Sequence, residues 1–553
     1  MLDLLEEKVT AAPDKPLYSF LDRDLVVSTS LSYRDVHSRA RRFARTLQYH
    51  HCAGKPVLLY CPHGPEFLIG FFACVLAGTW AVPVARHRAR SQVGLAALCR
   101  VSGATTIIST SARASSLSRA LAGTEIMMLS VDQDCVAAED YRRPAITPTD
   151  IAFIQFTSGS TSSPRGVVIS HANVMHNADQ IRQAFATTAD DVGVTWLPFH
   201  HDMGLIGHVI QPLFAGIHNY FLNPMDFLAR PARWLQAISD FGGTISGGPD
   251  FAFALATDKV SEHELTGLTL AKWRLAYSGA EKIRPETLAR FAHKFSATGF
   301  ASDSWFPCYG LAESTLFVTG QFGVEACRPS GPQRCRSSVC VGKPVADTSV
   351  MIKHPGSEDN VVDGNAGEVC ISSPSVAVGY FNDKVASKKT FRTLTDNGRH
   401  YVRTGDCGFM RDQRLYLLGR YKNVIKRRGC SYHAEDIEAA LKIGLGEWGI
   451  QLCAAFAVDV DDTERLVLLL EQGRRLTSTE KKPHRQLTET AAALIVDQFG
   501  IAPDDIQIVA ANTLPLTSSG KIQRHACVDF YQQRTKKADR LQKTEVSDDG
   551  LQA

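Results

Sequence analysis

The sequence lacks paired cysteine motifs, although it contains fourteen cysteines in 553 residues. No two of them form a C-x-x-C pair, and the spacing of Cys327, Cys335 and Cys340 fits none of the common zinc sites. Cysteines scattered in this way through a long chain are typical of reduced thiols inside a cell. We therefore expect neither a disulfide framework nor a zinc centre.

A strong excess of one charge is also missing. The 60 Lys and Arg residues nearly balance the 57 Asp and Glu residues, which leaves a net charge of +3. No dense stripe of basic residues with interleaved aromatic residues occurs, so the sequence does not indicate nucleic-acid binding. A small molecule or another protein is the expected partner.

The chain shows neither a secretory signal nor a clear membrane span. Its start, MLDLLEEKVT, has no apolar core behind a basic end, which predicts a cytoplasmic protein. The uncharged run from Phe67 to Ala85 is long enough to suggest a membrane helix. Because Gly78 interrupts this run and AVPVA follows, we expect a helix and then a buried strand, with no integral membrane segment.

Strand and helix patterns alternate along most of the chain, which predicts an α/β fold with mostly parallel sheets covered by helices on both faces. Short strands and turns replace this pattern from about residue 349 to 418. After residue 419 the pattern is helix (434–441), strand (453–458), strand (465–470), helix (488–499) and strand (506–510), as in a small α+β unit.

This pattern predicts a large N-terminal domain, hinged to a small α+β C-terminal domain. The large domain would span residues 1–419 and contain two α/β sheet subdomains, with a β-barrel-like part at about 340–418. The C-terminal lid would span 420–534. The polar tail, 535–553, is expected to be disordered.

The loop TSGSTSSPRG, Thr157 to Gly166, directly follows the apolar strand pattern Ile151 to Phe156. Its hydroxyls and unhindered backbone N–H groups are suited to binding a triphosphate. The loop lacks the G-x-x-x-x-G-K-[ST] pattern of P-loop enzymes, and on its own it cannot be told from an ordinary turn. Five further clusters, in order along the chain, point to the same chemistry.

Three of these clusters lie in the middle of the chain. WLPFHHDMGLIG places His201 at a strand end, where α/β sheets bind ligands. AYSGAEKI follows with Gly279 and Ala280, whose small size would let a planar ring approach the backbone. YGLAEST adds Tyr309, which can stack on a base, and Glu313, a carboxylate that can hold Mg²⁺ against phosphates.

The last two clusters lie nearer the C-terminus. YVRTGDCGF contains Asp406, whose carboxylate can accept both hydroxyls of a ribose. LPLTSSGKIQR places Lys521 on a loop rich in Ser and Gly. Taken separately, each cluster is an unremarkable loop, and a single lysine is usually an exposed surface residue. Together they predict adenylation of a carboxylate by ATP.

In this order, the motifs resemble those of the superfamily of acyl-CoA synthetases, nonribosomal-peptide adenylation domains and luciferases. The resemblance covers nearly the whole chain. Within it, WLPFHHDMGLIG, LAYSGAEKIRPETLARFAHKF, YGLAEST with LFVTG, PSVAVGY and RTGDCGF look most like the fatty acyl-AMP ligases. The resemblance implies that a fatty acid is activated to acyl-AMP with ATP and Mg²⁺. The acyl group would then pass to the phosphopantetheine of an acyl carrier protein, supplied in trans.

The resemblance also implies roles for individual residues. The β and γ phosphates would be bound by Thr157, Ser158, Gly159, Ser160 and Thr161, with Arg165 as a cationic contact. His201 would gate the site, and Gly279, Ala280 and Glu281 with Tyr309 and Gly310 would enclose adenine. Glu313 would hold Mg²⁺, Asp406 the ribose, and Arg420 the ribose or phosphates. Lys422 matches the hinge position and Lys521 the catalytic lysine. The fatty chain is expected near Phe199, Met203 and Ile206.

The chain departs from the family pattern in three places. Ser162 and Arg165 replace the usual Gly and Lys of the phosphate loop, although arginine keeps the charge. Near the hinge, Ser431 and Ala434 replace Asn and Pro. The segment from Thr319 to Val341, where fatty acyl-AMP ligases carry extra residues that hinder use of CoA, looks short.

These departures leave two alternatives open. One is an acyl-CoA or aryl-acid CoA ligase of the same fold, which the short segment favours. The other is an inactive adenylate-binding protein, suggested by the altered phosphate loop. The presence of Glu313, Asp406 and Lys521 favours an enzyme, because a protein that only binds has no need of the lysine.

Overall fold

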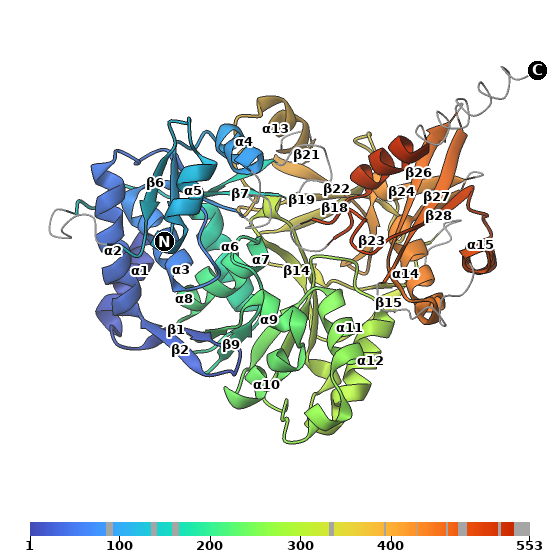
Figure 1. The fold of residues 1–553 in the computed structure, drawn as a ribbon, viewed down its shortest axis with the longest axis horizontal. Helices are drawn as coiled ribbons and strands as arrows, with labels where there is room; N and C mark the ends of the chain where they lie inside the picture. Colours follow the sequence, from blue (N-terminus) through green and yellow to red (C-terminus); the bar gives the residue numbers. More distant parts are fainter. Residues whose placement is uncertain are drawn as a thin grey trace, which may run out of the picture.

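The computed structural model describes residues 1–84, 92–133, 141–157, 165–330, 337–391, 394–396, 398–427, 430–460, 463–473, 484–517 and 521–535. The phosphate-loop residues Ser158, Gly159, Ser160, Thr161 and Ser162 lie outside these ranges, as do residues 536–553 of the predicted tail. Figure 1 shows blue and green regions that form the large part of the molecule, with an orange-to-red C-terminal unit beside them.

The first sheet has seven strands in the order β20-β8-β7-β4-β3-β5-β6. Its strands are β3 (Pro56–Leu59), β4 (Trp80–Pro83), β5 (Thr106–Ser109), β6 (Met127–Ser130), β7 (Ile151–Phe156), β8 (Gly166–Ser170) and β20 (Gly379–Tyr380). Helices α3 (Pro65–Ala77), α4 (Gln92–Ser102) and α5 (Ala114–Ala120) connect its parallel strands. The uncharged run forms α3, which ends at Gly78 with φ of 66°, and then the buried strand β4, as the sequence predicted.

The second sheet has nine strands in the order β17-β14-β13-β12-β11-β9-β10-β1-β2. Its strands are β1 (Pro16–Leu21), β2 (Val27–Ser32), β9 (Val192–Thr195), β10 (His218–Phe221), β11 (Ile245–Gly248), β12 (Leu275–Ser278), β13 (Trp305–Gly310), β14 (Phe317–Gly320) and β17 (Lys343–Pro344). Strands β1, β10, β9, β11, β12 and β13 are parallel neighbours. Their carboxyl ends therefore lie at one edge of the sheet, where open α/β sheets bind ligands.

The helices of this part carry apolar faces that pack on the sheets. They are α1 (Leu2–Ala11), α2 (Tyr33–Tyr49), α6 (His171–Ala184), α7 (Asp202–Leu205), α8 (Gln211–Ala215), α9 (Pro224–Ala229), α10 (Ala232–Asp240), α11 (Asp250–Lys259) and α12 (Pro285–Phe295). In α12, for example, Leu288, Phe291 and Phe295 recur at helical spacing and are all buried. One large hydrophobic core extends from Met1 to Leu415.

An antiparallel sheet of five strands follows, in the region where the sequence pattern predicted short strands and turns. It consists of β18 (Ser349–Lys353), β19 (Gly367–Ser372), β21 (Leu394–Asp396), β22 (Arg399–Arg411) and β23 (Arg414–Arg420), with helix α13 (Lys384–Phe391) nearby. A two-stranded ribbon, β15 (Ala326–Cys327) and β16 (Ser338–Val339), precedes it. The Ser338 hydroxyl donates to the carbonyl of Leu417 and so attaches this ribbon to β23.

The C-terminal unit begins with two strands that the sequence pattern did not predict, and the predicted order of helices and strands follows them. It contains β24 (Val424–Arg427), β25 (Cys430–His433), α14 (Ala434–Gly444), β26 (Ile450–Val460), β27 (Thr463–Gln472), α15 (His484–Phe499) and β28 (Asp505–Val509). Its own hydrophobic core includes Ile437, Leu468 and Ile495. The mixed α/β fold with a smaller C-terminal unit is thus confirmed, while the domain boundaries remain predictions.

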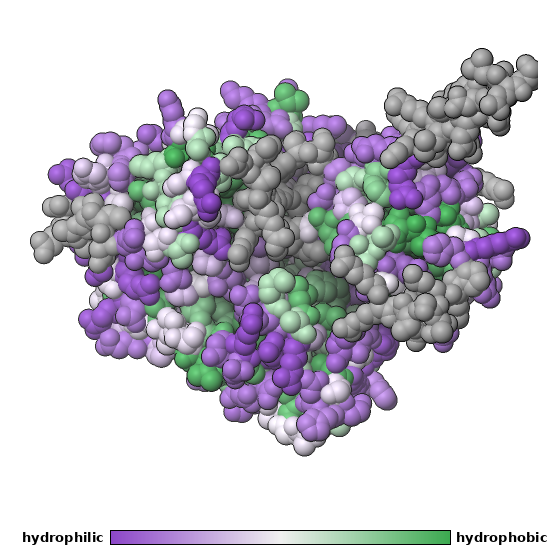
Figure 2. All heavy atoms as spheres, in the orientation of Figure 1, coloured by the Kyte–Doolittle hydropathy of each residue, from purple (hydrophilic) through white to green (hydrophobic). Residues whose placement is uncertain are grey.

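The face shown in Figure 2 is mainly hydrophilic, with hydrophobic residues in separate groups. Among the described residues, no helix has the length and apolar character needed to cross a membrane. The twelve cysteines in the described ranges are all free thiols, and most of them are buried.

Candidate active site

One cavity lies at the carboxyl ends of the parallel strands and reaches across to the C-terminal unit. Residues from most of the sequence clusters line it, namely Thr157, His201, Ala280, Tyr309, Gly310, Glu313, Arg420 and Lys521. We call the part around Thr157, Glu313, Arg420 and Lys521 the charged end. Segments more than 350 positions apart in the chain therefore meet around one space.

The opposite part of the cavity, which we call the deep end, lies among residues near the amino ends of the strands. Gly193, Asn219 and Ile245 are direct neighbours across β10, β9 and β11, and all three line the cavity. Most of the remaining wall is apolar and includes Ile181, Phe185, Met203, Ile217, Leu316 and Phe317. An apolar chain can be received here, with its reactive end among the charges.

The expected position of the fatty chain is only partly correct. Met203 lines the cavity, but Phe199 and Ile206 do not. Phe199 is 2% exposed and packs edge-on against Phe221 and face-on against His63. Its ring belongs to the core under the cavity, and the sequence could not show which side of the loop faces the open space.

Tyr309, Asp406 and Arg420 form a hydrogen-bonded group at the charged end. The Tyr309 hydroxyl donates to Asp406 Oδ2 at 2.6 Å, and Arg420 Nε lies 2.9 Å from Asp406 Oδ1. Asp406 on β22 and Arg420 on β23 are direct cross-strand partners. Asp406 raises the pKa of Arg420, which keeps the guanidinium charged beside the cavity.

The turn after β12 contains two small residues, Gly279 and Ala280. A Cβ at Gly279 would lie 2.9 Å from Cys308 Sγ, so glycine permits the ends of β12 and β13 to approach. Ala280 has φ of 66° and lines the cavity, whereas Gly279 and Glu281 are not part of its wall. The Glu281 carboxylate instead accepts the backbone N–H of Phe251 at 2.6 Å and fixes the turn to α11.

Glu313 lies on a tight loop between β13 and β14. Gly310 leaves room for this loop, because a Cβ there would lie 1.8 Å from the carbonyl oxygen of Leu316. The Tyr380 hydroxyl donates to Glu313 Oε1 at 2.8 Å, and the guanidinium of Arg165 lies over the Tyr380 ring, 5.2 Å from its centre. Arg165 is therefore linked to Glu313 through Tyr380, a residue for which no role was predicted.

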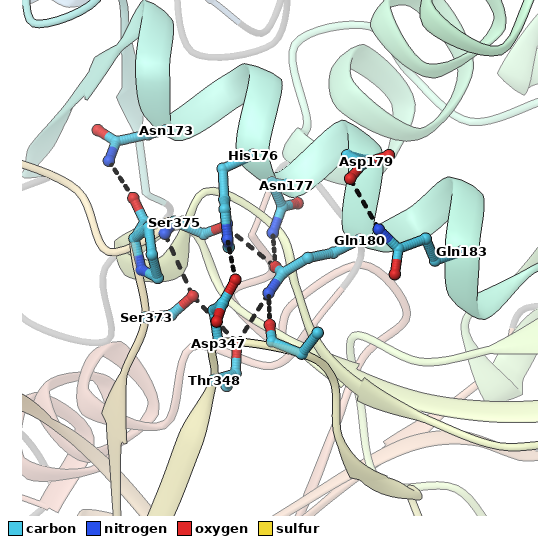
Figure 3. Close-up of polar contacts among 12 residues, drawn as sticks. Asn173, His176, Asn177, Asp179, Gln180, Gln183, Asp347, Thr348, Ser373 and Ser375 are labelled. Atoms are coloured by element: carbon cyan, nitrogen blue, oxygen red, sulfur yellow. Dashed lines mark hydrogen bonds and ion pairs between the residues drawn. The ribbon is translucent and has the colours of Figure 1, made fainter.

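A polar network on α6, drawn in part in Figure 3, also contacts β14, the strand that follows the Glu313 loop. Asn177 accepts the backbone N–H of Phe317 and donates to its carbonyl, at 3.0 and 2.8 Å. His176 Nδ1 lies 2.7 Å from the hydroxyl of Ser375, which also donates to Gln180 at 3.1 Å. The network joins α6 to β14 and to the turn between β19 and β20. It was not predicted from the sequence because its members on α6 lie within an ordinary helix pattern.

His201 caps the short helix α7 and is paired with its neighbour. Its Nδ1 lies 2.7 Å from Asp202 Oδ1, and both residues line the cavity. Burial alone would raise the pKa of Asp202, but His201, a backbone hydrogen bond and Lys521 outweigh it and lower the pKa. Asp202 thus stays ionised beside the charged end, in contact with a histidine that faces the same space.

Lys521 enters the cavity from the C-terminal unit. Its ammonium group donates to the carbonyl of Ala280, and its backbone N–H donates to the Thr517 hydroxyl at 3.0 Å. Burial lowers its pKa, while the negative charge of Glu281 acts in the opposite direction. The lysine of the C-terminal unit therefore lies directly against the turn that follows β12.

A buried ion pair holds the C-terminal unit in this position. Lys282 Nζ lies 2.6 Å from Asp436 Oδ1 on α14, with the two side chains 9% and 7% exposed. Lys282 follows the turn that Lys521 contacts, so the pair and the lysine act on the same segment. Lys422, the predicted hinge residue, lies in a single turn of 3₁₀ helix at Tyr421–Asn423, between β23 and β24. Neither Lys282 nor Asp436 was singled out from the sequence.

The sequence of this chain matches a known protein family. The AMP-binding enzyme family matches residues 5–381. The medium-chain-fatty-acid–[acyl-carrier-protein] ligase JamA of Moorena producens is 32% identical over 558 residues, covering 95% of this chain and 94% of JamA. The ligase TtuA of Teredinibacter turnerae, with the same description, is 31% identical over 590 residues, covering 93% and 90%.

A solved structure gives the same result for the fold. It comes from a study of fatty acyl-adenylate ligases of E. coli and L. pneumophila, and it matches with a TM-score of 0.86 at 31% identity. The match covers 97% of this chain and 98% of the other. The chain therefore belongs to the AMP-binding enzyme family, and the resemblance to fatty acyl-AMP ligases that its motifs predicted is confirmed.

Proposed function

We propose that this enzyme activates a fatty acid with ATP to acyl-AMP and then transfers the acyl group to the phosphopantetheine thiol of an acyl carrier protein supplied in trans. One observation carries the proposal. A lysine from the C-terminal unit meets segments of the large domain around a cavity that is charged at one end and largely apolar beyond it. The names of JamA and TtuA support a medium-chain acid and a carrier protein as acceptor.

In the first step, an oxygen of the fatty acid carboxylate attacks the α-phosphorus of ATP. A bond forms between this oxygen and phosphorus, and the bond from the α-phosphorus to the bridging oxygen breaks, so pyrophosphate leaves. Lys521 is placed to neutralise charge that develops on the transferring phosphoryl group. Asp406 would hold the ribose hydroxyls, while Tyr309 and Ala280 would enclose the adenine.

In the second step, the carrier thiol attacks the carbonyl carbon of acyl-AMP. A carbon–sulfur bond forms, the bond from carbon to the AMP oxygen breaks, and the thiol proton passes to solvent. AMP is a good leaving group, so this step needs mainly access and alignment. Rotation about the segment at Lys422 would withdraw Lys521 and open the cavity to the carrier.

The residues of the charged end fit a magnesium ion that is held mainly by the nucleotide. Among the described residues, no three His, Cys, Asp or Glu side chains are grouped as a metal site. Mg²⁺ commonly binds through one or two carboxylates together with substrate phosphates, and Glu313 supplies one carboxylate at the cavity wall. Bound there, the ion would offset phosphate charge, and Tyr380 would orient Glu313.

We also expect the enzyme to act in the cytoplasm.

CoA as the acceptor is the second candidate, because the segment from Thr319 to Val341 is short. A mixed pool of fatty acids with ATP, Mg²⁺, CoA and a phosphopantetheinylated carrier would separate the two, with products identified by mass spectrometry. We expect pyrophosphate, acyl-AMP and acyl-carrier. Efficient formation of acyl-CoA would favour the CoA ligase, whereas no pyrophosphate with any acid would favour an inactive adenylate-binding protein.

A further inference from the structure

The segment that carries Lys521 is a short loop closed by its own backbone. The Lys521 N–H donates to the Thr517 hydroxyl at 3.0 Å, and the Thr517 N–H donates to the Lys521 carbonyl at 2.7 Å. Leu516 and Ile522 form a β-bridge, and Ile522 packs on a hydrophobic core of the C-terminal unit. A helix then begins at Arg524. Because only two residues separate Arg524 from Lys521, contacts of the arginine also restrain the lysine.

Arg524 forms a largely buried group with two carboxylates of α14. Its Nε and Nη2 donate to Glu438 Oε1 and Oε2 at 2.9 and 2.5 Å, which is the two-point geometry of an arginine fork. Its Nη1 lies 3.0 Å from Glu435 Oε1. The side chains of Arg524, Glu438 and Glu435 are 16%, 11% and 20% exposed. Ion pairs shielded from water in this way interact more strongly than surface pairs.

The positive charge of Arg524 is needed by both carboxylates. Burial raises the pKa of Glu438 to about 7, although Arg524 opposes this shift. Burial alone would also raise the pKa of Glu435, but Arg524 and hydrogen bonds to the carboxylate outweigh it and lower the pKa. Loss of the guanidinium charge would leave two buried carboxylates without their paired cation, which is strongly destabilising. A useful substitution of Arg524 must therefore keep the charge.

The start of α14 joins this group to the hinge and to the large domain. Asn423, in the 3₁₀ turn of the predicted hinge, donates to Glu435 Oε1 at 2.6 Å. Asp436, the next residue of α14, pairs with Lys282 of the large domain at 2.6 Å. The hinge turn, the contact with the large domain and the loop of Lys521 are thus connected through one turn of helix.

We infer that Arg524 is a positioning residue that fixes the loop of Lys521 for adenylation. Its pairing with Glu435 and Glu438 holds this loop at the depth at which the lysine meets the turn after β12. Arg524 is not among the described residues that line the cavity, so it acts through the lysine and not on the substrate. This inference rests on the proposed function, because it concerns the same adenylation step.

Arg524→Lys tests this inference, because lysine keeps the charge but cannot form the two-point pair with Glu438. We expect the kcat for pyrophosphate release to fall about 10- to 100-fold, as for a catalytic group that is displaced by about 1 Å. The KM for ATP should change little. The rate of transfer from preformed acyl-AMP to a phosphopantetheinylated carrier should also change little, because Lys521 is withdrawn in that step.

A second pair of measurements separates positioning from general damage to the C-terminal unit. In an enzyme that already carries Lys521→Ala, Arg524→Lys should lower the remaining rate of pyrophosphate release by less than about twofold, since the residue that it positions is absent. General damage would lower the rate by the same factor in both backgrounds. Glu435→Gln leaves the Glu438 pair intact and should give the same pattern with a smaller loss. Thermal unfolding is followed for every variant.

The matched control is Arg427→Lys in the same unit. The Arg427 side chain is 18% exposed, donates to the carbonyl of Glu464 and pairs with Asp504 at 3.0 Å. These partners lie outside the loop of Lys521. The substitution should therefore cost a similar amount of stability and leave the rate of pyrophosphate release unchanged.

Three outcomes would overturn this inference alone. They are full adenylation activity of folded Arg524→Lys, equal slowing of adenylation and transfer, and an equal loss of rate in the Lys521→Ala background. The last of these would show that the arginine acts independently of the lysine. No pyrophosphate from any acid with the unchanged enzyme would overturn both this inference and the proposed function.

Discussion

The two ends of the cavity are built in different ways. The charged end is assembled from segments of both units, with Lys521 from the C-terminal unit beside Glu313 of the large domain and Arg420 at the end of β23. The deep end belongs to the large domain alone, where residues of α6 and of three neighbouring strands are fixed by the sheet. The charged end can therefore be taken apart by movement of one unit, while the deep end keeps its shape and can hold the acyl chain between the two steps.

The largest effect expected at the charged end comes from Lys521→Ala. Removing a group that stabilises the transition state typically costs about 3–4 kcal/mol, which lowers the rate about 100- to 1000-fold. ATP binding should change little. Pyrophosphate release and ATP affinity, measured in parallel, check this. Turnover equal to that of the unchanged enzyme would show that Lys521 has no role in the mechanism.

Asp406→Asn should act mainly on nucleotide binding. The substitution keeps the size of the side chain but removes the charge that pairs with Arg420 and that we propose holds the ribose. Loss of charge-assisted hydrogen bonds costs about 1.5–3 kcal/mol, so the KM for ATP should rise about 10- to 100-fold. Because Asp406 is 8% exposed, thermal unfolding is followed at the same time. A variant that unfolds normally and keeps its KM for ATP would contradict the assigned role.

Asp436→Asn tests whether the contact between the C-terminal unit and the large domain is needed for adenylation but not for transfer of the acyl group. The substitution weakens the buried pair with Lys282, and we expect adenylation to slow about tenfold while transfer from preformed acyl-AMP is spared. Asp258→Asn is the control. Asp258 pairs with Arg290 at 2.5 Å, but the two side chains are 49% and 59% exposed, so little change is expected. Equal slowing of both steps would rule out a role specific to adenylation.

The smallest effect concerns the pH dependence of stability at the deep end. The pKa of His208 is about 4 in the folded protein, below the usual value of 6.5, so only the unfolded chain takes up this proton between those values. The unfolding free energy should therefore fall as the pH falls below about 6.5. His208→Gln should reduce this slope, measured by thermal unfolding at a series of pH values. Above about pH 7 the slope should differ little between the variant and the unchanged protein. An unchanged slope would show that His208 is not buried as a neutral group.

Much of the fold could be predicted because its signals are local. The break of the apolar run at Gly78 and the spacing of Leu288, Phe291 and Phe295 each reflect the conformation of a short segment. The charged end was also predictable, since its polar residues follow strands at the edge where ligands bind. His201, Tyr309 and Glu313 were found in this way.

The deep end could not be predicted, because its residues have no local signal. His208, Asn219 and Tyr277 come together only when the chain folds, and each looks ordinary in its own segment. The same reason explains the wrong placement of Phe199 and Ile206 and the omission of Tyr380 and Lys282. These positions depend on register and on contacts between units, which one sequence does not specify.

The most direct test of the account is a crystal structure of the enzyme with a non-hydrolysable acyl-adenylate analogue. The account predicts that one ligand occupies the whole cavity. Its adenine should lie between Ala280 and Tyr309, its ribose on Asp406, the ammonium group of Lys521 near the acyl phosphate linkage, and the acyl chain in the deep end beside Gly193 and Ile245. Adenosine bound away from Glu313 and Asp406, or an acyl chain that leaves the cavity by another route, would contradict it.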